Sequence, residues 1–440
     1  MQSTVAILFE YQKYSFKIGN ENRFIGKEFT FTESTLNVLT ALNDDKKFLV
    51  IGYDTIKPRN LVGVLKVEDI TIQIFPKLFK DRIEEHEDIV ARNVLKMFAN
   101  SDYFPIKNID ESDLVTDELD MFEVFIGIFA KNLISLLKSN RHRDYIKRSE
   151  KLHFVREKIN TKNYGNPAKL HVIPCTYHEF SIDTTLNRTL KYTVYLLSKR
   201  VESIVNFQML KEINSILEDV TLEPIDIDKI DTISYNRLND CFKPYIEICK
   251  IFLQNSTLSL QASQIDTFSL LIPMERLFES FIANLLQQNQ EYFFDPDVTV
   301  SKQKCIGYLV TSLDGSKDND FRLIPDIVIE GRNEKYIIDT KYKLLNRNDT
   351  KLGVSQQTMY QMYAYATKSR AKSIILLYPD LGEKIEGNWS ISYNSGNDTT
   401  NLHARCVNLS YDLCDEVQDI EFRQDLKNIL SPLRKTMDGI

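Results

Sequence analysis

The chain has 440 residues, a formal net charge of −7 at pH 7, 43% hydrophobic residues and 27% charged residues. This length favours two or three domains, and the composition excludes collagen-like, low-complexity and disulfide-rich chains. No apolar run approaches the roughly eighteen residues of a membrane span, and the N-terminus lacks the pattern of a secretory leader, so we expect a cytoplasmic protein with no membrane partner.

Residues 1–105 are predicted to form a β-rich N-terminal domain. Pro76 should end its last strand, since proline has no N–H for a sheet ladder, and a helix near residues 88–100 should close the domain. This region holds no set of catalytic residues, which is consistent with a partner-facing adaptor. The predicted strands are short apolar runs separated by Asn, Gly, Asp and Pro, namely VAILFE, YSFKIG, KFLVIGY, LVGVLKV and ITIQIFPK.

Residues 106–265 are predicted to form a helical middle region. A long helix should begin at Ser112 or Asp113, either of which can cap it. Asp183 could cap the next long helix. The first helix carries apolar residues in steps of three and four, which predicts a buried stripe through Leu119, Phe122, Ile126, Phe129, Leu133 and Leu136.

Charge is unevenly distributed along the chain. Residues 138–169 hold ten Lys or Arg against three acidic residues, whereas residues 81–123 hold four against thirteen. Because phosphate neutralisation supplies most non-specific DNA affinity, the basic stretch is the best candidate DNA path. The alternative is a solvated helix end and loop. The candidate contacts are Arg141, Arg143, Lys147, Arg148, Arg156 and Lys158.

Residues 266–440 alternate between strand and helix patterns, which predicts a mixed central sheet flanked by helices. Within RLIPDIVIE and KYIIDTKYK, Asp326 would close one strand, and Asp339 and Lys341 would share a face of the next. Magnesium is usually held by one or two carboxylates with water and substrate phosphate, and a nearby lysine can orient an attacking water. The set predicts metal-dependent phosphodiester hydrolysis, and solvated charges at strand ends are the alternative.

Two predicted helices flank these strands. In PMERLFESFIANLLQQ, Glu279 lies at the edge of the apolar arc, where it is either a partly exposed flank residue or a third acid aimed into the site. In VSQQTMYQMYAYATKSR, Gln357, Gln361 and Tyr365 are four residues apart and therefore lie on one helical face.

The sequence lacks the motifs of two other ligand classes. The nearest approach to a phosphate-binding loop, GNENRFIGKE, has six residues between its glycines and Glu28 where a hydroxyl is required. This chain should therefore bind no nucleotide in a P-loop of its own, and any NTP dependence must come from a partner. The cysteine and histidine spacings match no zinc site.

The order of Glu279, Pro325-Asp326, Asp339-x-Lys341 and Gln361-x-x-x-Tyr365 resembles PD-(D/E)XK nucleases of the branch with a QxxxY motif. More narrowly, residues 50–380 resemble McrC, the nuclease subunit of McrBC restriction systems, in the segments VGVLKVEDITIQIFPKL, HRDYIKRSEKLHFVREKIN, CTYHEFSIDTTLNRTLKYTVYLL, MERLFESFIANLL, DTKYK and YQMYAYA. One departure is that Val155–Lys158 stands where that family commonly has a glycine.

The resemblance implies an α+β multidomain chain with a C-terminal nuclease fold, and Mg²⁺ or Mn²⁺ as cofactor. It also implies an McrB-like AAA+ GTPase ring that the N-terminal region enters and stimulates, and double-stranded methylated DNA as substrate. Two alternatives stay open: a catalytically idle assembly factor of the NTPase, and a stand-alone repair or recombination nuclease. For the nuclease that the resemblance implies, Asp326, Asp339 and Glu279 would bind metal and Lys341 would orient water. Gln361 and Tyr365 would position these groups or hold the DNA backbone.

Overall fold

The computed structural model describes residues 4–25, 28–68, 70–80, 83–103, 120–160, 172–256, 267–310, 321–331 and 334–434. It confirms a mixed α/β chain with several sheets. Two compact units are present. The first combines Lys66–Glu68 with Phe122–Leu270, and the second combines Thr4–Leu65, Asp69–Met121 and Leu271–Ile440.

The N-terminal part of the second unit is built from strands. In one sheet, β1 (Thr4–Phe9) pairs in parallel with β8 (Ile70–Phe75), next to β7 (Leu61–Val67). Strand β8 ends directly before Pro76, as the missing N–H predicts. After it come the short helix η1 (Lys77–Phe79) and α2 (Ile83–Ala99). A second sheet, in the order β3-β4-β2-β6-β5, consists of Arg23–Ile25, Glu28–Phe31, Tyr14–Ile18, Thr55–Pro58 and Leu49–Ile51, with α1 (Glu33–Lys46) between β4 and β5.

The first unit contains most of the helices of the middle region. Helix α3 (Met121–Ser139) buries the predicted apolar stripe, with Phe122, Ile126, Phe129 and Leu133 fully inaccessible to solvent. The predicted start at Ser112 or Asp113 and the stripe residue Leu119 lie outside the described residues. The other helices are α4 (Thr185–Ser198), α5 (Ile204–Ile216), α6 (Ile227–Asp231), η5 (Asp240–Phe242) and α7 (Lys243–Ser256).

Helix α4 is capped by Thr184 and not by Asp183. The Thr184 hydroxyl accepts from the Asn187 amide at 3.2 Å. The prediction that Asp183 caps this helix is therefore wrong. The Asp183 carboxylate instead accepts hydrogen bonds from Arg188 and from Thr221.

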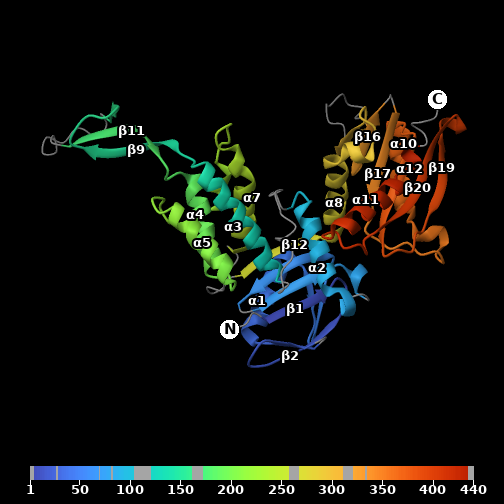
Figure 1. Ribbon diagram of the computed structural model, residues 1–440, viewed down its shortest axis with the longest axis horizontal. Coiled ribbons are helices and arrows are strands. Elements are labelled where there is room, and N and C mark those ends of the chain that lie inside the picture. The colour runs from blue at the N-terminus through green and yellow to red at the C-terminus, as the bar shows by residue number, and fades with distance from the viewer. Residues whose placement is uncertain are drawn as a thin grey trace. The chain divides into compact units, whose positions relative to one another are not determined.

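Part of the basic stretch forms strands, whereas Lys138 belongs to the end of α3 and residues 140–143 lie outside any helix or strand. Strands β9 (Asp144–Leu152) and β11 (Ile173–Ser181) pair antiparallel along their whole length, and β10 (Lys158–Ile159) joins the other edge of β11. The rings of Tyr145 and Phe180, opposite each other, have centroids 5.1 Å apart. Figure 1 shows β9 and β11 as two long neighbouring arrows.

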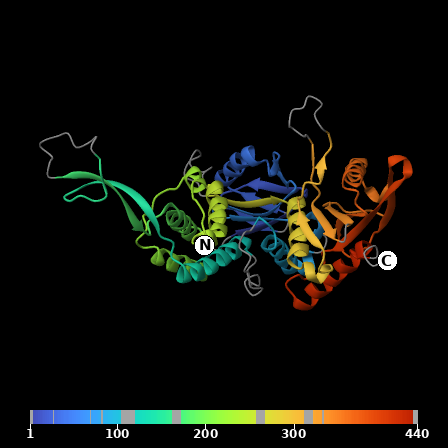
Figure 2. The ribbon, with the colours of Figure 1, turned by 90° about the horizontal axis from the view of Figure 1, so that it is seen from above.

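The C-terminal part of the second unit is a six-stranded mixed sheet, as predicted. Its order is β13-β16-β17-β18-β20-β19, with β17, β18 and β20 parallel and the other pairs antiparallel. Figure 2 shows helices on both faces of this sheet. The strands are Thr299–Lys302, Ile327–Gly331, Glu334–Thr340, Ser373–Asp380, Asp398–Asn408 and Gly387–Tyr393, in that order across the sheet.

Apolar side chains on both faces of this sheet explain its helical cover. On one face, Met362, Tyr365 and Ala366 of α10 (Gln356–Ser369) pack in one core with residues of β17 and β18. Strand β12 (Thr267–Pro273) leads directly into α8 (Met274–Gln288), whose apolar arc is buried. The smaller elements are α9 (Gln290–Phe293), β14 (Gly307–Tyr308), β15 (Arg322–Leu323), η7 (Thr350–Gly353), η8 (Asn394–Gly396), α11 (Glu416–Ile429) and α12 (Ser431–Arg434).

None of the helices in the described part of the chain combines the length and the apolar character that a membrane crossing requires.

Candidate active site

Asp326 lies beside the end of the strand that carries Asp339. Strand β16 begins at Ile327, so Asp326 precedes its strand and does not close it, contrary to the prediction. Because β16 and β17 are antiparallel, with Ile327 opposite Ile338, the start of one strand meets the end of the other. The Thr340 amide and hydroxyl both donate to Asp326 Oδ2 at 2.7 Å. Asp326 is thus fixed next to the end of β17, where Asp339 lies.

Asp339 is fully buried at the end of β17. Its Oδ2 lies 2.6 Å from Lys341 Nζ. Lys341 faces this oxygen as an ion-pair partner, and within the described ranges Oδ1 has no hydrogen-bond partner. Burial raises the pKa of Asp339 to about 7, the Asp326 charge adds to this increase, and Lys341 opposes it. The fold therefore buries a carboxylate whose charge is balanced by the Lys341 ammonium and whose second oxygen has no donor among the described residues.

Glu279 comes from α8 and lines the same pocket as Asp326 and Lys341. Its Oε1 accepts from Gln303 Nε2 at 2.9 Å, and the Gln303 amide donates to the Asp326 carbonyl at 2.9 Å. Burial raises the pKa of Glu279, and the Asp326 charge raises it further. The pocket has a volume of about 340 Å³ and is lined by Glu275, Glu279, Asp326, Thr340, Lys341, Tyr342, Lys343, Gly353, Ser355, Thr358 and Tyr378.

Gln361 and Tyr365 lie behind this pocket and are not among its lining residues. Gln361 Nε2 donates to the Tyr365 hydroxyl at 2.8 Å, and that hydroxyl donates to the Ile324 carbonyl at 3.1 Å. Burial raises the pKa of Tyr365, with a further contribution from the charge on Asp339. The two side chains therefore hold the segment that leads into Asp326. Gln357, on the same predicted stripe, is exposed.

The acidic residues fit a hard divalent cation. In the part of the chain that the structure describes, no three or more His, Cys, Asp or Glu side chains are close enough together to hold a metal by themselves. Magnesium does not need such a set, because it binds through one or two carboxylates and keeps several waters. Asp339 offers a buried oxygen, Oδ1, that has no donor among the described residues, beside the charge of Asp326. This chemistry suits a cation better than it suits the protein alone.

The predicted DNA contacts lie on or near the β9–β11 sheet. Arg141, Arg143, Lys147 and Lys158 are exposed. Two others are engaged within the sheet: Arg148 lies 2.5 Å from Glu179, and the Arg156 guanidinium lies 3.9 Å from the centroid of the Tyr177 ring. DNA binding by these residues stays a prediction.

The segment without the family's glycine contains a left-handed residue. Glu157 has φ +51°, a conformation that glycine adopts at no steric cost. Its carboxylate accepts from the His178 amide at 2.9 Å and contacts His178 Nδ1 at 3.1 Å. These contacts to the neighbouring strand hold a conformation that a non-glycine residue adopts only with strain.

Sequence reasoning missed two residues that hold the carboxylates. Thr340 stands between Asp339 and Lys341, so its position at the site could have been noted, although alternation assigns its side chain to the opposite face. Gln303 gives no such signal, because its contact with Glu279 depends on how β13 packs near α8.

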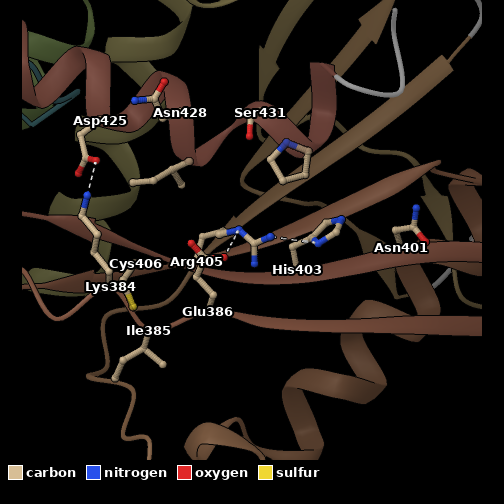
Figure 3. Close-up of a pocket in the computed structure, with 12 residues that line it drawn as sticks. Lys384, Ile385, Glu386, Asn401, His403, Arg405, Cys406, Asp425, Asn428 and Ser431 are labelled. Carbon is tan, nitrogen blue, oxygen red and sulfur yellow. Dashed lines mark hydrogen bonds and ion pairs between the residues drawn. The ribbon is translucent and has the colours of Figure 1, made fainter. Parts of the chain in front are cut away.

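A second cavity, of about 540 Å³, lies in the same unit and contains charges that are already compensated. Lys384 Nζ lies 3.3 Å from Asp425 Oδ1. Arg405 donates to the Gly387 and Ala404 carbonyls and to Asn388 Oδ1. Figure 3 shows Lys384 extended toward Asp425 and the Arg405 guanidinium directed at His403. With its cations engaged in this way, the cavity presents no charge that calls for a ligand.

Comparison with known proteins places the chain in a family. A family model described as "McrBC 5-methylcytosine restriction system component" matches residues 56–379. No curated protein matches. One similar structure is a half-complex from a tetradecameric assembly of Thermococcus gammatolerans McrB AAA+ hexamers with bound McrC. The matching chain in it has 20% sequence identity and a TM-score of 0.64, and the match covers 97% of this chain and 100% of that one. A cryo-EM structure of the Thermococcus gammatolerans McrBC complex matches with 22% identity and a TM-score of 0.48, over 65% of this chain and 88% of that one.

The first of these structures shares the fold at low identity, and the family match extends over more than half of the sequence. The family match confirms the McrBC resemblance of the sequence. The chain belongs to the family of McrBC 5-methylcytosine restriction system components.

Proposed function

We propose that this chain is the magnesium-dependent DNA endonuclease subunit of a modification-dependent restriction complex, and that it hydrolyses phosphodiester bonds. One observation carries the proposal. Asp339 is buried 2.6 Å from Lys341, with its Oδ1 unpaired among the described residues, and the neighbouring Asp326 and Glu279 line a pocket with that lysine. A fold that maintains such a carboxylate at a cost in stability favours a site over an idle surface.

Asp326 and Asp339 would hold the ion, with Glu279 assisting the ion or its water, and with Mn²⁺ as an alternative to Mg²⁺. Such an ion, when bound, polarises a phosphate oxygen and makes a bound water more acidic. Thr340 fixes Asp326 through its amide and hydroxyl, so the orientation of that carboxylate is set before an ion arrives. Gln303 does the same for Glu279.

Lys341 would act on the reacting groups themselves. Its side chain is 31% exposed, so the ammonium can reach a phosphate or a water in the pocket while it remains beside Asp339. There it would orient the attacking water and balance the negative charge that develops on the phosphoryl oxygens. Gln361 and Tyr365 would act through the backbone at Ile324, as positioning residues. The product is a 5′ phosphate, formed by in-line displacement.

The fold and the motif order support a PD-(D/E)XK nuclease of the QxxxY branch. The mixed sheet carries Asp326 before one central strand and Asp339 at the end of the next, and α10 presents Gln361 and Tyr365 behind them. This is the arrangement that the resemblance implies for that superfamily.

We infer the partner from the family and from the similar structure. The family description names 5-methylcytosine, and the similar structure is of McrB AAA+ hexamers with bound McrC. An McrB-like GTPase ring and double-stranded methylated DNA are therefore the proposed partners. The β-rich residues 1–105 would face the ring as an adaptor, residues 106–265 would carry the DNA path, and residues 266–440 would form the nuclease domain.

The test is the Lys341→Ala variant of the full chain, assayed with its GTPase partner. Cleavage of methylated DNA should be abolished, while partner binding and stimulated GTP hydrolysis stay unchanged. Lys335→Ala is the matched control: it lies at the other end of the same strand and pairs with Glu330 at 3.1 Å. Normal cleavage by Lys341→Ala would refute the assignment.

The same assay separates the two alternatives. An idle assembly factor would stimulate GTP hydrolysis but would cut no DNA in its wild-type form. A stand-alone nuclease would cut DNA without the GTPase.

A further inference from the structure

We propose that Glu10 and Tyr342 form a positioning pair, through which the N-terminal sheet holds the chain segment that carries Asp339 and Lys341. The pair would set the rate of cleavage through the position of Lys341. This inference rests on the proposed function, because it concerns how that site is held in shape.

The contact joins two parts of the second unit that are distant in sequence. Tyr342 directly follows Lys341, and its hydroxyl donates to Glu10 Oε2 at 3.0 Å. The Lys77 amide donates to the same oxygen at 3.2 Å. The Leu78 amide also bonds to the Tyr342 hydroxyl. Tyr342 is therefore held by the turn after β1 and by the turn after β8.

The surroundings make this contact difficult to replace with water. Glu10 is 2% exposed, and its Oε1 has no hydrogen-bond partner among the described residues. Burial raises the pKa of Glu10 to about 7. The Lys77 ammonium lies 5.5 Å from the centroid of the Tyr342 ring and 5.0 Å from that of Tyr11. Loss of the Tyr342 hydroxyl would leave the Glu10 carboxyl with one fewer donor in a buried place.

The position of Tyr342 explains why the pair matters for Lys341. The Lys341 amide donates to the Leu377 carbonyl at 2.9 Å, so strand β18 holds the backbone up to that residue. Beyond Thr340 the chain is no longer part of β17, and Tyr342 is the next residue with a buried anchor. Lys341 thus lies between two fixed points. Without the second, the ammonium can shift relative to Asp339, and a displacement of about 1 Å can cost about a hundredfold in rate.

The test compares Tyr342→Phe, Glu10→Ala, Glu10→Gln and the double variant Tyr342→Phe/Glu10→Ala, each as the full chain with its GTPase partner. Tyr14→Phe is the matched control, since the Tyr14 hydroxyl is also buried and accepts from the Phe9 amide at 2.8 Å within the N-terminal part. The readouts are kcat and KM for DNA cleavage, together with stimulated GTP hydrolysis.

We expect Tyr342→Phe to lower kcat by about tenfold or more, with KM and GTP hydrolysis unchanged. Glu10→Ala should have a similar effect, and the double variant should be no slower than the slower single variant, because both remove one contact. Glu10→Gln should retain most of the rate, since its amide oxygen still accepts the hydroxyl. Tyr14→Phe should cleave like the wild type.

Wild-type kcat in Tyr342→Phe, an equal loss in Tyr14→Phe, or additive losses in the double variant would each overturn the pair while leaving the proposed nuclease intact. A wild-type chain that cuts no DNA would instead refute the proposed function, and the pair with it.

Discussion

Replacement of Asp183 by alanine should destabilise the first unit without affecting the candidate active site. The Asp183 carboxylate accepts from Arg188 Nε at 2.7 Å and Nη2 at 2.5 Å, and from the Thr221 amide at 2.9 Å and hydroxyl at 2.8 Å. Arg188 also reaches Glu223 at 2.9 Å. These contacts tie the start of α4 to the segment that follows α5. They give Asp183 a structural role.

The size of the effect follows from the pKa. Mainly because of the Arg188 hydrogen bonds, the pKa of Asp183 falls from 3.8 to about 2. One pKa unit corresponds to about 1.4 kcal/mol, so this change corresponds to about 2 to 3 kcal/mol. The side chain is only 12% exposed, so solvent screens little of it. Because the folded-state pKa is depressed, this stability is fully present above about pH 4 and is lost as the pH falls through about 2.

Local unfolding can be followed in this unit alone. The Thr221 amide should exchange its hydrogen faster in Asp183→Ala than in the wild type at pH 7, by a factor that matches about 2 to 3 kcal/mol. The only tryptophan, Trp389, lies in the second unit, and its fluorescence during urea unfolding should be unchanged. Asp219→Ala, an exposed acid in the same unit, is the control. Equal protection of Thr221 in both variants would refute this reasoning.

Two further predictions concern the site and the DNA path. Tyr365→Phe removes the hydroxyl that joins Gln361 to the Ile324 carbonyl, so it should lower kcat for cleavage and leave DNA affinity unchanged. An unchanged kcat would contradict the positioning role. Arg143→Ala should weaken DNA binding on any sequence and make the plot of log affinity against log salt shallower by about 0.9 if Arg143 contacts one phosphate. An unchanged slope would remove Arg143 from the DNA path.

The local part of the site could be predicted from the sequence, because spacing along a strand or helix fixes which side chains share a face. Asp339-x-Lys341 brings a carboxylate and an ammonium within 2.6 Å of each other, and Gln361-x-x-x-Tyr365 brings two side chains into hydrogen-bond contact on α10. The apolar periodicity of PMERLFESFIANLLQQ likewise predicts α8, with its buried arc.

Contacts between distant segments could not be predicted in this way. Glu10 and Tyr342 are 332 positions apart, and nothing local to either residue indicates the other. Strand β9 was missed for a different reason. It is mostly exposed on both faces and rich in Lys and Arg, so the alternation that marks a half-buried strand is absent from its sequence.

Asp339 should complete a divalent-cation site. Calorimetric titration of Mg²⁺ and Mn²⁺ into the full chain measures this, with the wild type compared with Asp339→Asn. Asp380→Asn is the matched control, since Asp380 is also a buried acid at the end of a strand of the same sheet but accepts from the Gly382 and Lys384 amides. The wild type and Asp380→Asn should bind the ions with the same saturable heat, and Asp339→Asn should lose it. Identical titrations for all three proteins would contradict the claim.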